Sequence, residues 1–325
     1  MRIIGTGSCL PETTVSNDDL AAMMDTSDEW ISTRTGIRNR HIAVNETTTS
    51  MALEASKQAL ESAGLAPEEL DMIIAGTVSP DYLFPTLSCE IQAALGAVHA
   101  TAFDLSAGCS GFLFALATAD AYLRTGECKN ILLIGAETLS KMMDWTDRST
   151  CVLFGDGAGA AVVTADPDNV AAFVQGSDGA SGMALYCENR PVDNPFYRQK
   201  HGMEHAGAPY YYTHMDGQAV YRFAVKTVPV AIGQVLEKSG VSLDDVDLFL
   251  LHQANLRIIE SVAKRLKQPM EKFPTDLEQC GNSSAASVPI LLNQMVREGR
   301  IKPGDTIVMA GFGAGLTWGA CVIKW

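Results

Sequence analysis

Three side chains that can carry out acyl-transfer chemistry follow strand-like runs in this 325-residue chain. Cys109 lies in DLSAGCSGF (residues 104–112), His252 lies in LFLLHQANLRI, and Asn282 lies in CGNSSAASVP. A cysteine among small residues at the expected start of a long helix is typical of a nucleophile, because a helix N-terminus stabilises a thiolate and lowers its pKa. Neutral histidine and asparagine side chains can both donate hydrogen bonds to a carbonyl that becomes an enolate. Together the three residue types indicate acyl-enzyme chemistry.

Each of these residues also has an ordinary structural interpretation. A cysteine is commonly a small buried residue, a histidine that ends an apolar strand can be a buried hydrogen-bonding residue, and Gly-Asn commonly forms a turn. Among the other seven cysteines only Cys280, beside Gly281, lies at a comparable junction. The chain has no C-x-x-C pair, so a disulfide framework is not expected.

An internal repeat gives the three residues related positions. Residues 60–71 (LESAGLAPEELD) resemble residues 236–247 (LEKSGVSLDDVD), and residues 107–126 align without a gap with residues 280–299. Each matched segment leads into an apolar run, MIIAGT or LFLLHQ after the first pair and NILLIGAE or TIVMAGFG after the second. Such runs, alternating with helices, predict an α/β fold whose sheets are covered on both faces.

The repeat divides the chain into a first half, residues 1–165, and a second half, residues 166–325. In the ungapped alignment Cys109 matches Asn282, two residues after the position of Cys280, so we interpret Cys280 as structural. His252 takes the place of Gly76 at the end of the matched strand. Ligands bind at the carboxyl ends of strands in α/β sheets, so we expect the three side chains to meet at the centre of the molecule.

The expected architecture is a five-layer α-β-α-β-α sandwich. The helix that begins SGFLFALATADAYL is apolar nearly all round, which is typical of a helix buried between two sheets. The opening MRIIGTGSCLP predicts a first β-strand that ends at a proline turn and does not resemble a signal peptide. Residues 165–212 fit neither copy, and a loop-rich insertion is expected at about residues 176–214.

Composition narrows the class of protein. The net charge of −14 argues against nucleic acid as a partner. No apolar run reaches the roughly 18 residues of a membrane span, so no membrane partner is expected and a cytoplasmic location follows. Four basic residues form an exception to the acidic surface and favour an acidic partner: Arg222, Arg257, Lys264 and Arg265. An ordinary solvated helix face explains the same pattern.

Two further patterns do not indicate a cofactor or a metal. GFGAGLTWG (residues 311–319) and FGDGAGAAVV (residues 154–163) lack the helix that follows a dinucleotide-binding loop. Backbone N–H groups of the first loop are better interpreted as an oxyanion hole. The histidines at 201, 205 and 214 match no common ligand spacing, so no metal is expected.

DLSAGCSGF, HQANLRI, GNSSAASVP and GFGAGLTWG, in this order, resemble the β-ketoacyl-[acyl-carrier-protein] synthase III family, the initiating condensing enzymes of bacterial type II fatty acid synthesis. The resemblance covers essentially the whole chain, including SDEWISTRTGIRNRHIA. It implies a thiolase-like duplicated fold in which Cys109 takes an acyl group from acyl-CoA. His252 and Asn282 would then hold the thioester carbonyl of malonyl-acyl carrier protein as CO₂ leaves. The resulting carbanion would attack the acyl group on Cys109, with no cofactor beyond these substrates.

The same resemblance implies roles for residues around the nucleophile. The backbone N–H groups of Cys109 and Ala314 would form the oxyanion hole, and a positive φ at Ala314 would be strained. Phe84 would reach across a homodimer interface into the acyl pocket of the partner, and Phe312 would border the entrance.

The resemblance also implies where the substrates bind. Trp30 and Arg148 would enclose the adenine of CoA, and Arg34 and Thr35 would hold the nucleotide and its phosphate. The basic residues would contact the acidic carrier protein; they are Arg222, Arg257, Lys264 and Arg265.

Three rival functions follow from the same residues. One is an acyl-CoA-dependent acyltransferase or condensing enzyme of secondary metabolism, and another is a non-catalytic synthase subunit. The third is a nicotinamide oxidoreductase, for which the βαβ fingerprint is missing. Cys109 argues against the non-catalytic subunit, and His252 with Asn282 favours condensation, because simple acyl transfer needs no enolate site.

Overall fold

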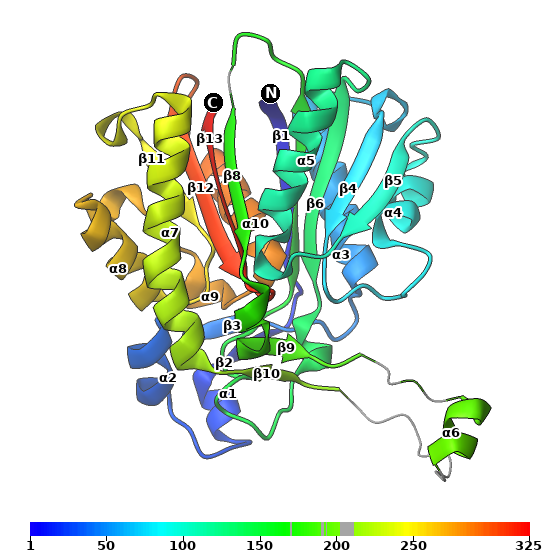
Figure 1. The fold of residues 1–325 in the computed structure, drawn as a ribbon, viewed down its shortest axis with the longest axis vertical. Helices are drawn as coiled ribbons and strands as arrows, with labels where there is room; N and C mark the ends of the chain where they lie inside the picture. The colour runs from blue at the N-terminus through cyan, green and yellow to red at the C-terminus, as the bar shows by residue number, and fades with distance from the viewer. Residues whose placement is uncertain (170, 190–191, 193, 202–210) are drawn as a thin grey trace.

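The computed structural model describes residues 1–169, 171–189, 192, 194–201 and 211–325. Its strands form two main sheets, and helices lie between the sheets and on their outer faces (Figure 1). The expected five-layer arrangement is confirmed.

The first sheet is built from residues 2–164 and has the strand order β1-β7-β6-β4-β5. β4 runs parallel to β5 and β6, whereas β7 runs antiparallel to both β6 and β1. The strand bounds are β1 (Arg2–Cys9), β4 (Met72–Gly76), β5 (Thr101–Leu105), β6 (Asn130–Glu137) and β7 (Gly157–Thr164).

The second sheet follows the same plan in the order β11-β12-β13-β8. Its strands are β8 (Ala172–Ser177), β11 (Leu248–Leu251), β12 (Thr306–Gly313) and β13 (Thr317–Lys324). β8 pairs antiparallel with β13 as β1 does with β7, so it belongs to the repeat. The expectation that residues 165–212 fit neither copy is therefore wrong for β8. The strand order supports the division at residues 165 and 166, which we retain as a proposal.

Helices fill three layers around the two sheets. The middle layer is α5 (Gly111–Thr125) and α10 (Ser287–Arg297), and each contacts strands of both sheets. α5 is the helix that the sequence predicts to be buried. The outer helices of the first half are α3 (Thr48–Ala63) and α4 (Leu87–Leu95), which pack on the first sheet. Those of the second half are α7 (Gly217–Ser239), which packs on the second sheet, and α8 (Leu256–Leu266), which contacts α7.

Equivalent helices of the two halves end in the same way. α3 ends at Gly64 and α7 ends at Gly240, and both glycines have left-handed backbone conformations with φ of 66° and 70°. Glycine is favoured there because a side chain strains this conformation. The repeated glycines of LESAGLAPEELD and LEKSGVSLDDVD therefore mark one turn used twice.

Smaller elements lie at the carboxyl ends of the strands. They are β2 (Thr14–Ser16), β3 (Asn39–His41), α1 (Asn17–Ala21), α2 (Asp28–Thr35) and α9 (Leu277–Cys280). β9 (Leu185–Cys187) pairs with β10 (Thr213–Met215), and α6 (Pro195–His201) lies away from the body of the molecule (Figure 1).

The three histidines of the insertion fall differently in the structure. His205 and the side chain of His201 lie outside the described residues. His214 stacks on Tyr186 with 5.0 Å between ring centroids. Within the described part of the chain, no three His, Cys, Asp or Glu side chains form a group that could hold a metal ion.

α7 bears on the expectation about membranes. By length and composition it is the one described helix that could cross a membrane, although Arg222 and Lys226 interrupt its apolar residues. Its residues Val220, Ala224, Val228 and Ile232 are buried in a core shared with the second sheet. Because this face packs on β8, β12 and β13, the apolar composition has a packing explanation.

Candidate active site

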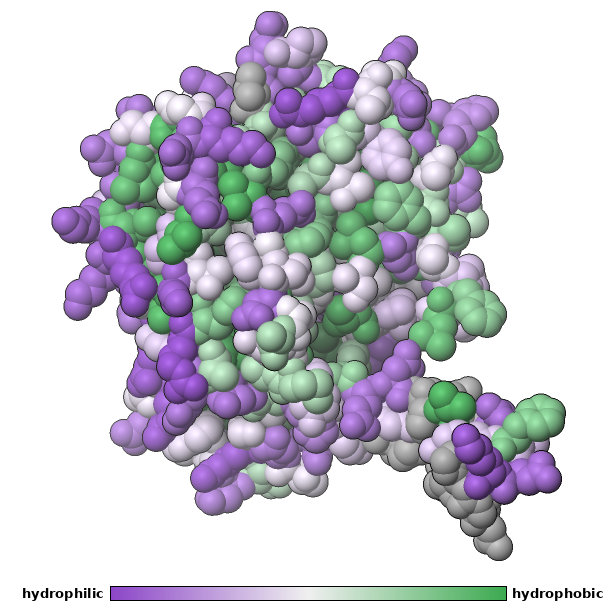
Figure 2. All heavy atoms as spheres, in the orientation of Figure 1, coloured by the Kyte–Doolittle hydropathy of each residue, from purple (hydrophilic) through white to green (hydrophobic). Residues whose placement is uncertain are grey.

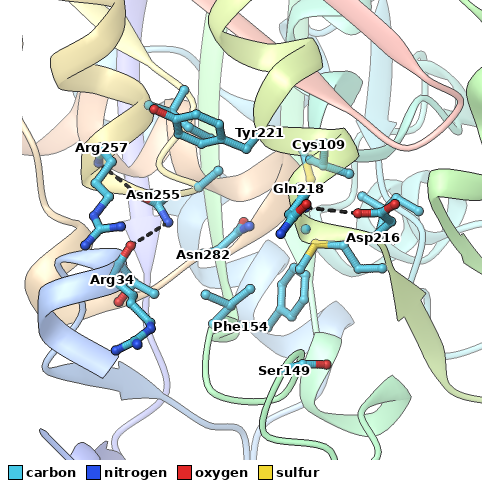
Figure 3. A pocket seen from close by; sticks show the side chains of 18 of the residues that line it. Arg34, Cys109, Ser149, Phe154, Asp216, Gln218, Tyr221, Asn255, Arg257 and Asn282 are labelled. Carbon is cyan, nitrogen blue, oxygen red and sulfur yellow. Dashed lines mark hydrogen bonds between the residues drawn. The ribbon is translucent and has the colours of Figure 1, made fainter. Parts of the chain in front are cut away.

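Two cavities meet at Cys109. The first has a volume of about 1030 Å³, and its walls include Cys109, His252 and Asn282. The second has a volume of about 670 Å³, and its walls include Cys109, Ser284 and Ala314. In the first cavity Cys109 lies on the side opposite Arg34 and Arg257 (Figure 3). The three predicted side chains therefore surround one space that reaches from basic residues to a thiol.

Cys109 lies in a 3₁₀ turn, Gly108–Ser110, which follows β5 and leads into α5. The side chain is 8% exposed. Burial raises the pKa of the thiol to about 12; the Ser284 hydroxyl partly opposes this change and the Glu137 carboxyl adds to it. The expectation of a lowered pKa is therefore wrong, because desolvation of the thiolate outweighs the stabilising effect of a helix start.

Two backbone segments approach very closely beside this thiol. A Cβ atom on Gly108 would lie 2.7 Å from the Ala314 nitrogen, and one on Gly313 would lie 2.4 Å from the Cys109 nitrogen. Glycine is therefore required at both positions, and the Cys109 and Ala314 segments lie side by side. Ala314 does not have a positive φ, so the strain that such a φ would cause is absent.

His252 follows β11, and its backbone N–H donates to the carbonyl of Ala310 at 2.8 Å. Its Nδ1 lies 2.7 Å from the Ser287 hydroxyl, which accepts a bond from the backbone N–H of Gln253 at 3.4 Å. When the Ser287 hydroxyl donates its hydrogen to Nδ1, Nε2 carries the ring proton and can donate to a bound carbonyl. Burial lowers the pKa of His252 to about 3, so the ring is neutral at physiological pH. The Phe312 ring packs edge-on against the imidazole of His252, with 5.4 Å between the ring centroids.

Asn282 is held by its backbone against the segment around Phe154. Its N–H donates to the carbonyl of Leu153 at 2.9 Å, and its own carbonyl accepts from Gly155 at 3.0 Å. The side-chain Oδ1 accepts the backbone N–H of Ser284 at 2.9 Å. Because Oδ1 is engaged in this way, the NH₂ group is the part of the side chain that can donate to a bound carbonyl.

The nucleotide-binding residues predicted from the sequence gather around Trp30. The Arg34 guanidinium lies 4.7 Å from the centre of the Trp30 ring and that of Arg148 lies 5.1 Å away. Arg148 also donates to the backbone carbonyl of Asp25. An adenine enclosed by Trp30 and Arg148 requires Arg148 to move away from the ring. Thr35 lines the cavity, but its hydroxyl already donates to the carbonyl of Ile31.

The four basic residues separate into two pairs. Arg222 and Arg257 line the first cavity, where Arg257 also donates to the carbonyl of Thr33 at 2.6 Å. Lys264 and Arg265 lie exposed in the last turn of α8, outside the walls of both cavities. Hydrophilic side chains cover this side of the molecule, over α7 and α8 (Figure 2).

Phe84 lies apart from the other predicted site residues. It is 85% exposed and lines neither cavity of its own chain.

Three polar residues close to the nucleophile were missed by sequence reasoning. Ser287 bonds His252, and the Ser284 hydroxyl donates to the carboxyl of Glu137 at 3.1 Å. The serines were visible in GNSSAASVP, directly after Asn282. Glu137 was visible as the one charged residue that ends the apolar run NILLIGAE.

The duplicated five-layer fold, with a cysteine, a neutral histidine and an asparagine around one cavity, defines a thiolase-fold acyltransferase. Residues 103–179 match the family 3-oxoacyl-[acyl-carrier-protein] synthase III, and residues 236–325 match the C-terminal family of the same enzyme. The chain belongs to the β-ketoacyl-[acyl-carrier-protein] synthase III family, whose members are acyltransferases that initiate type II fatty acid synthesis by condensation.

Individual relatives match the chain along its whole length. The β-ketoacyl-[acyl-carrier-protein] synthase III of Caldanaerobacter subterraneus subsp. tengcongensis is 50% identical, with 99% of this chain and 97% of the relative covered. The crystal structure of the Aquifex aeolicus synthase III is 45% identical with a TM-score of 0.91, covering 100% of this chain and 99% of that one. The priming β-ketosynthase of the R1128 polyketide pathway is 38% identical with a TM-score of 0.91, covering 99% and 96%.

Proposed function

We propose that this condensing enzyme carries the primer acyl group on Cys109. An acyl-CoA thioester enters the first cavity, and the sulfur of Cys109 attacks its carbonyl carbon. The backbone N–H groups of Cys109 and Ala314 stabilise the oxyanion, because their segments lie side by side at the junction of the two cavities. CoA then leaves as a thiolate, and the acyl group remains on the sulfur with the second cavity beside it.

His252 and Asn282 act in the second half of the reaction. The Nε2–H of the neutral imidazole and the NH₂ of Asn282 donate to the thioester carbonyl of malonyl-acyl carrier protein. Loss of CO₂ leaves an enolate that these donors stabilise. The enolate carbon attacks acyl-Cys109 and gives the 3-oxoacyl product. The observation that supports this assignment most directly is that His252 and Asn282 line the same cavity as the thiol. Hydrogen bonds to Ser287 and Ser284 hold the two side chains there.

The substrate-binding residues follow from the same cavity. Trp30, Arg34 and Thr35 line its outer part and receive the nucleotide of CoA, with Arg148 moving off the Trp30 ring. Phe312 packs on His252 and borders the route to the thiol.

An acidic acyl carrier protein docks at the mouth of this cavity. Arg222 and Arg257 lie at the mouth, and Lys264 and Arg265 extend the basic surface along α8. Reversing the charges of Lys264 and Arg265 should weaken the use of malonyl-acyl carrier protein and leave acyl-CoA loading intact. Because such contacts steer association, the defect should diminish at high salt.

The working form is a homodimer in which Phe84 reaches the acyl pocket of the partner. β5 is an outer strand of its sheet, and three neighbouring apolar side chains are exposed, namely Tyr82 at 58%, Leu83 at 78% and Phe84 at 85%. Such a patch marks a protein interface. Light scattering coupled to gel filtration should give twice the chain mass, and a monomer would contradict this assembly. A cytoplasmic location goes with these substrates.

A second candidate function is chain priming in secondary metabolism, favoured by the similarity to the R1128 priming β-ketosynthase. The two candidates differ in the carrier protein that receives the product. The two functions can be distinguished by offering malonyl-loaded carrier proteins of each pathway in turn to the acylated enzyme and measuring which one receives the 3-oxoacyl product.

The decisive experiment follows label through both half-reactions. The protein is incubated with radiolabelled acetyl-CoA or short branched acyl-CoAs, and malonyl-acyl carrier protein is then added. We expect label on Cys109, no label in Cys109→Ser, and transfer of label into a 3-oxoacyl product. His252→Ala and Asn282→Ala should keep acylation and lose decarboxylation. Label that never reaches Cys109 would overturn the mechanism, and label without a 3-oxo product would indicate a simple acyltransferase.

A further inference from the structure

A buried carboxyl group lies behind the nucleophile with no assigned role. Glu137 ends β6 and has no exposed surface. Its Oε1 accepts from the Ser284 hydroxyl at 3.1 Å, and its Oε2 accepts from the Ser79 hydroxyl at 2.5 Å and from the backbone N–H of Val78 at 3.1 Å. The Ser284 hydroxyl also opposes the rise of the Cys109 pKa, and both residues line the second cavity. The Ser284 hydroxyl thus lies between the thiol and the carboxyl that accepts its hydrogen bond.

The backbone of Ser284 keeps this hydroxyl in place. Ser284 has a φ of 51°, a conformation that non-glycine residues rarely adopt. Its N–H is fixed by the side chain of Asn282. Such strained residues cluster at functional sites because the surrounding structure holds them there.

Glu137 is a stronger base than the other candidate beside the thiol. Burial raises the pKa of Glu137 to about 7, whereas burial lowers the pKa of His252 to about 3. A general base is most effective when its pKa is near the working pH. His252 is therefore suited to donate a hydrogen bond, and Glu137 is suited to accept a proton.

The other titratable groups near Glu137 are engaged elsewhere. Cys109 faces it through Ser284. Lys141 binds the backbone carbonyl of Ser79 and pairs with Asp81 at 3.5 Å, and Asp156 accepts from Ser140 and Ala43. The hydrogen-bond donors of Glu137 are all neutral, so its protonation is set by burial and by these hydrogen bonds.

We propose that Glu137 accepts the proton of the Cys109 thiol through the Ser284 hydroxyl during loading and returns it during condensation. In loading, the S–H proton passes to the Ser284 oxygen and the Ser284 proton passes to Glu137 while the new C–S bond forms. The departing CoA thiolate takes a proton from solvent. In condensation, the enolate displaces the Cys109 thiolate, which recovers the proton from Glu137 by the reverse path. Each turnover thus restores the thiol and the carboxylate.

The proton moves as the C–S bond forms, because the free thiol is a much weaker acid than protonated Glu137. Loading should therefore slow about tenfold for each pH unit below about 7 and level off above it. This proposal rests on the acyl-Cys109 intermediate of the proposed function.

The test measures single-turnover acylation of Cys109 by radiolabelled acyl-CoA between about pH 5 and pH 9. Glu137→Gln keeps an acceptor for Ser284 but cannot take a proton, so the break near pH 7 should vanish. Loading at pH 8 should fall by about 10²-fold or more. Ser284→Ala, which keeps the carboxyl, should show the same loss, and the double variant should lose no more than the slower single variant. Ser284→Ala alone tests the relay if Glu137→Gln does not fold.

Asp276→Asn is the matched control. Burial raises the pKa of this carboxyl also to about 7, and both of its buried oxygens lack a hydrogen-bond partner among the described residues. The control should keep the break near pH 7. A break that persists in Glu137→Gln, a break that disappears in Asp276→Asn, or additive losses in the double variant would each overturn the relay.

Alkylation of Cys109 by iodoacetamide separates the relay from the proposed function. If acyl-CoA never labels the wild-type protein, the proposed function fails. A break near pH 7 in the alkylation rate of the wild-type protein that is absent from Glu137→Gln would still support the relay. Alkylation with an unchanged profile in Glu137→Gln would overturn it.

Discussion

The bond between Ser287 and His252 allows a prediction with a worked magnitude. The Ser287 hydroxyl lies 2.7 Å from Nδ1, and a hydrogen donated to Nδ1 leaves the imidazole proton on Nε2. Ser287→Ala removes the donor and leaves a buried nitrogen without a partner. A neutral hydrogen bond contributes about 0.5–1.5 kcal/mol, and a buried unsatisfied group costs about 1–3 kcal/mol. With about 1.4 kcal/mol for each factor of ten, decarboxylation should fall roughly tenfold and by no more than about 150-fold.

The assay compares two reactions of the same variant. Release of labelled CO₂ from malonyl-acyl carrier protein should fall, whereas acylation of Cys109 by acyl-CoA should keep its wild-type rate. Acylation is spared because the ring acts only on the malonyl carbonyl. The matched control is Ser56→Ala, which removes a buried hydroxyl bonded to the Ala52 carbonyl at 2.6 Å, within α3.

Two results would refute this reasoning. Equal losses of acylation and decarboxylation in Ser287→Ala would show a general defect of the site. Unchanged decarboxylation in a folded Ser287→Ala protein would show that the serine does not set the orientation of His252. Urea unfolding of Ser56→Ala and Ser287→Ala gives the loss of stability to be expected from a buried hydroxyl alone.

The remaining predictions concern pH and packing. Because burial lowers the pKa of His252 from 6.5 to about 3, CO₂ release by enzyme that is acylated beforehand, which bypasses the loading break near pH 7, should show no break near pH 6.5; such a break would mean a solvated ring. Gly313→Ala forces a Cβ against the Cys109 nitrogen, so labelling of Cys109 should be lost and urea unfolding should show a loss of about 1–3 kcal/mol; a fully active variant would contradict the close approach. Asp276 has a folded pKa raised from 3.8 to about 7, so its contribution to stability falls as pH rises through that window. Asp276→Asn should therefore raise the melting temperature, relative to wild type, more at pH 8 than at pH 5, and the opposite trend would exclude the burial effect.

Local patterns were enough to predict the architecture and the acyl-transfer residues. Apolar runs that end in polar residues mark buried strands, and a glycine after a helix marks its end, so the repeat predicted two related sheets. Cys109 and Asn282 occupy equivalent positions in that repeat, and His252 ends a matched strand, so their meeting followed from the topology. β8 escaped prediction because its outer-strand residues lack a continuous apolar run.

The sequence by itself determined the fold class, the family and the three residue types around the cavity, because these depend on local patterns and their order. Tertiary structure alone decided the protonation of the site. Burial raises the pKa of Cys109 and lowers that of His252, and this effect depends on segments distant in the chain that exclude water. It also decided that Ser287 orients His252 and that Ser284 links Cys109 to Glu137, since no spacing in the sequence places β6 behind the nucleophile.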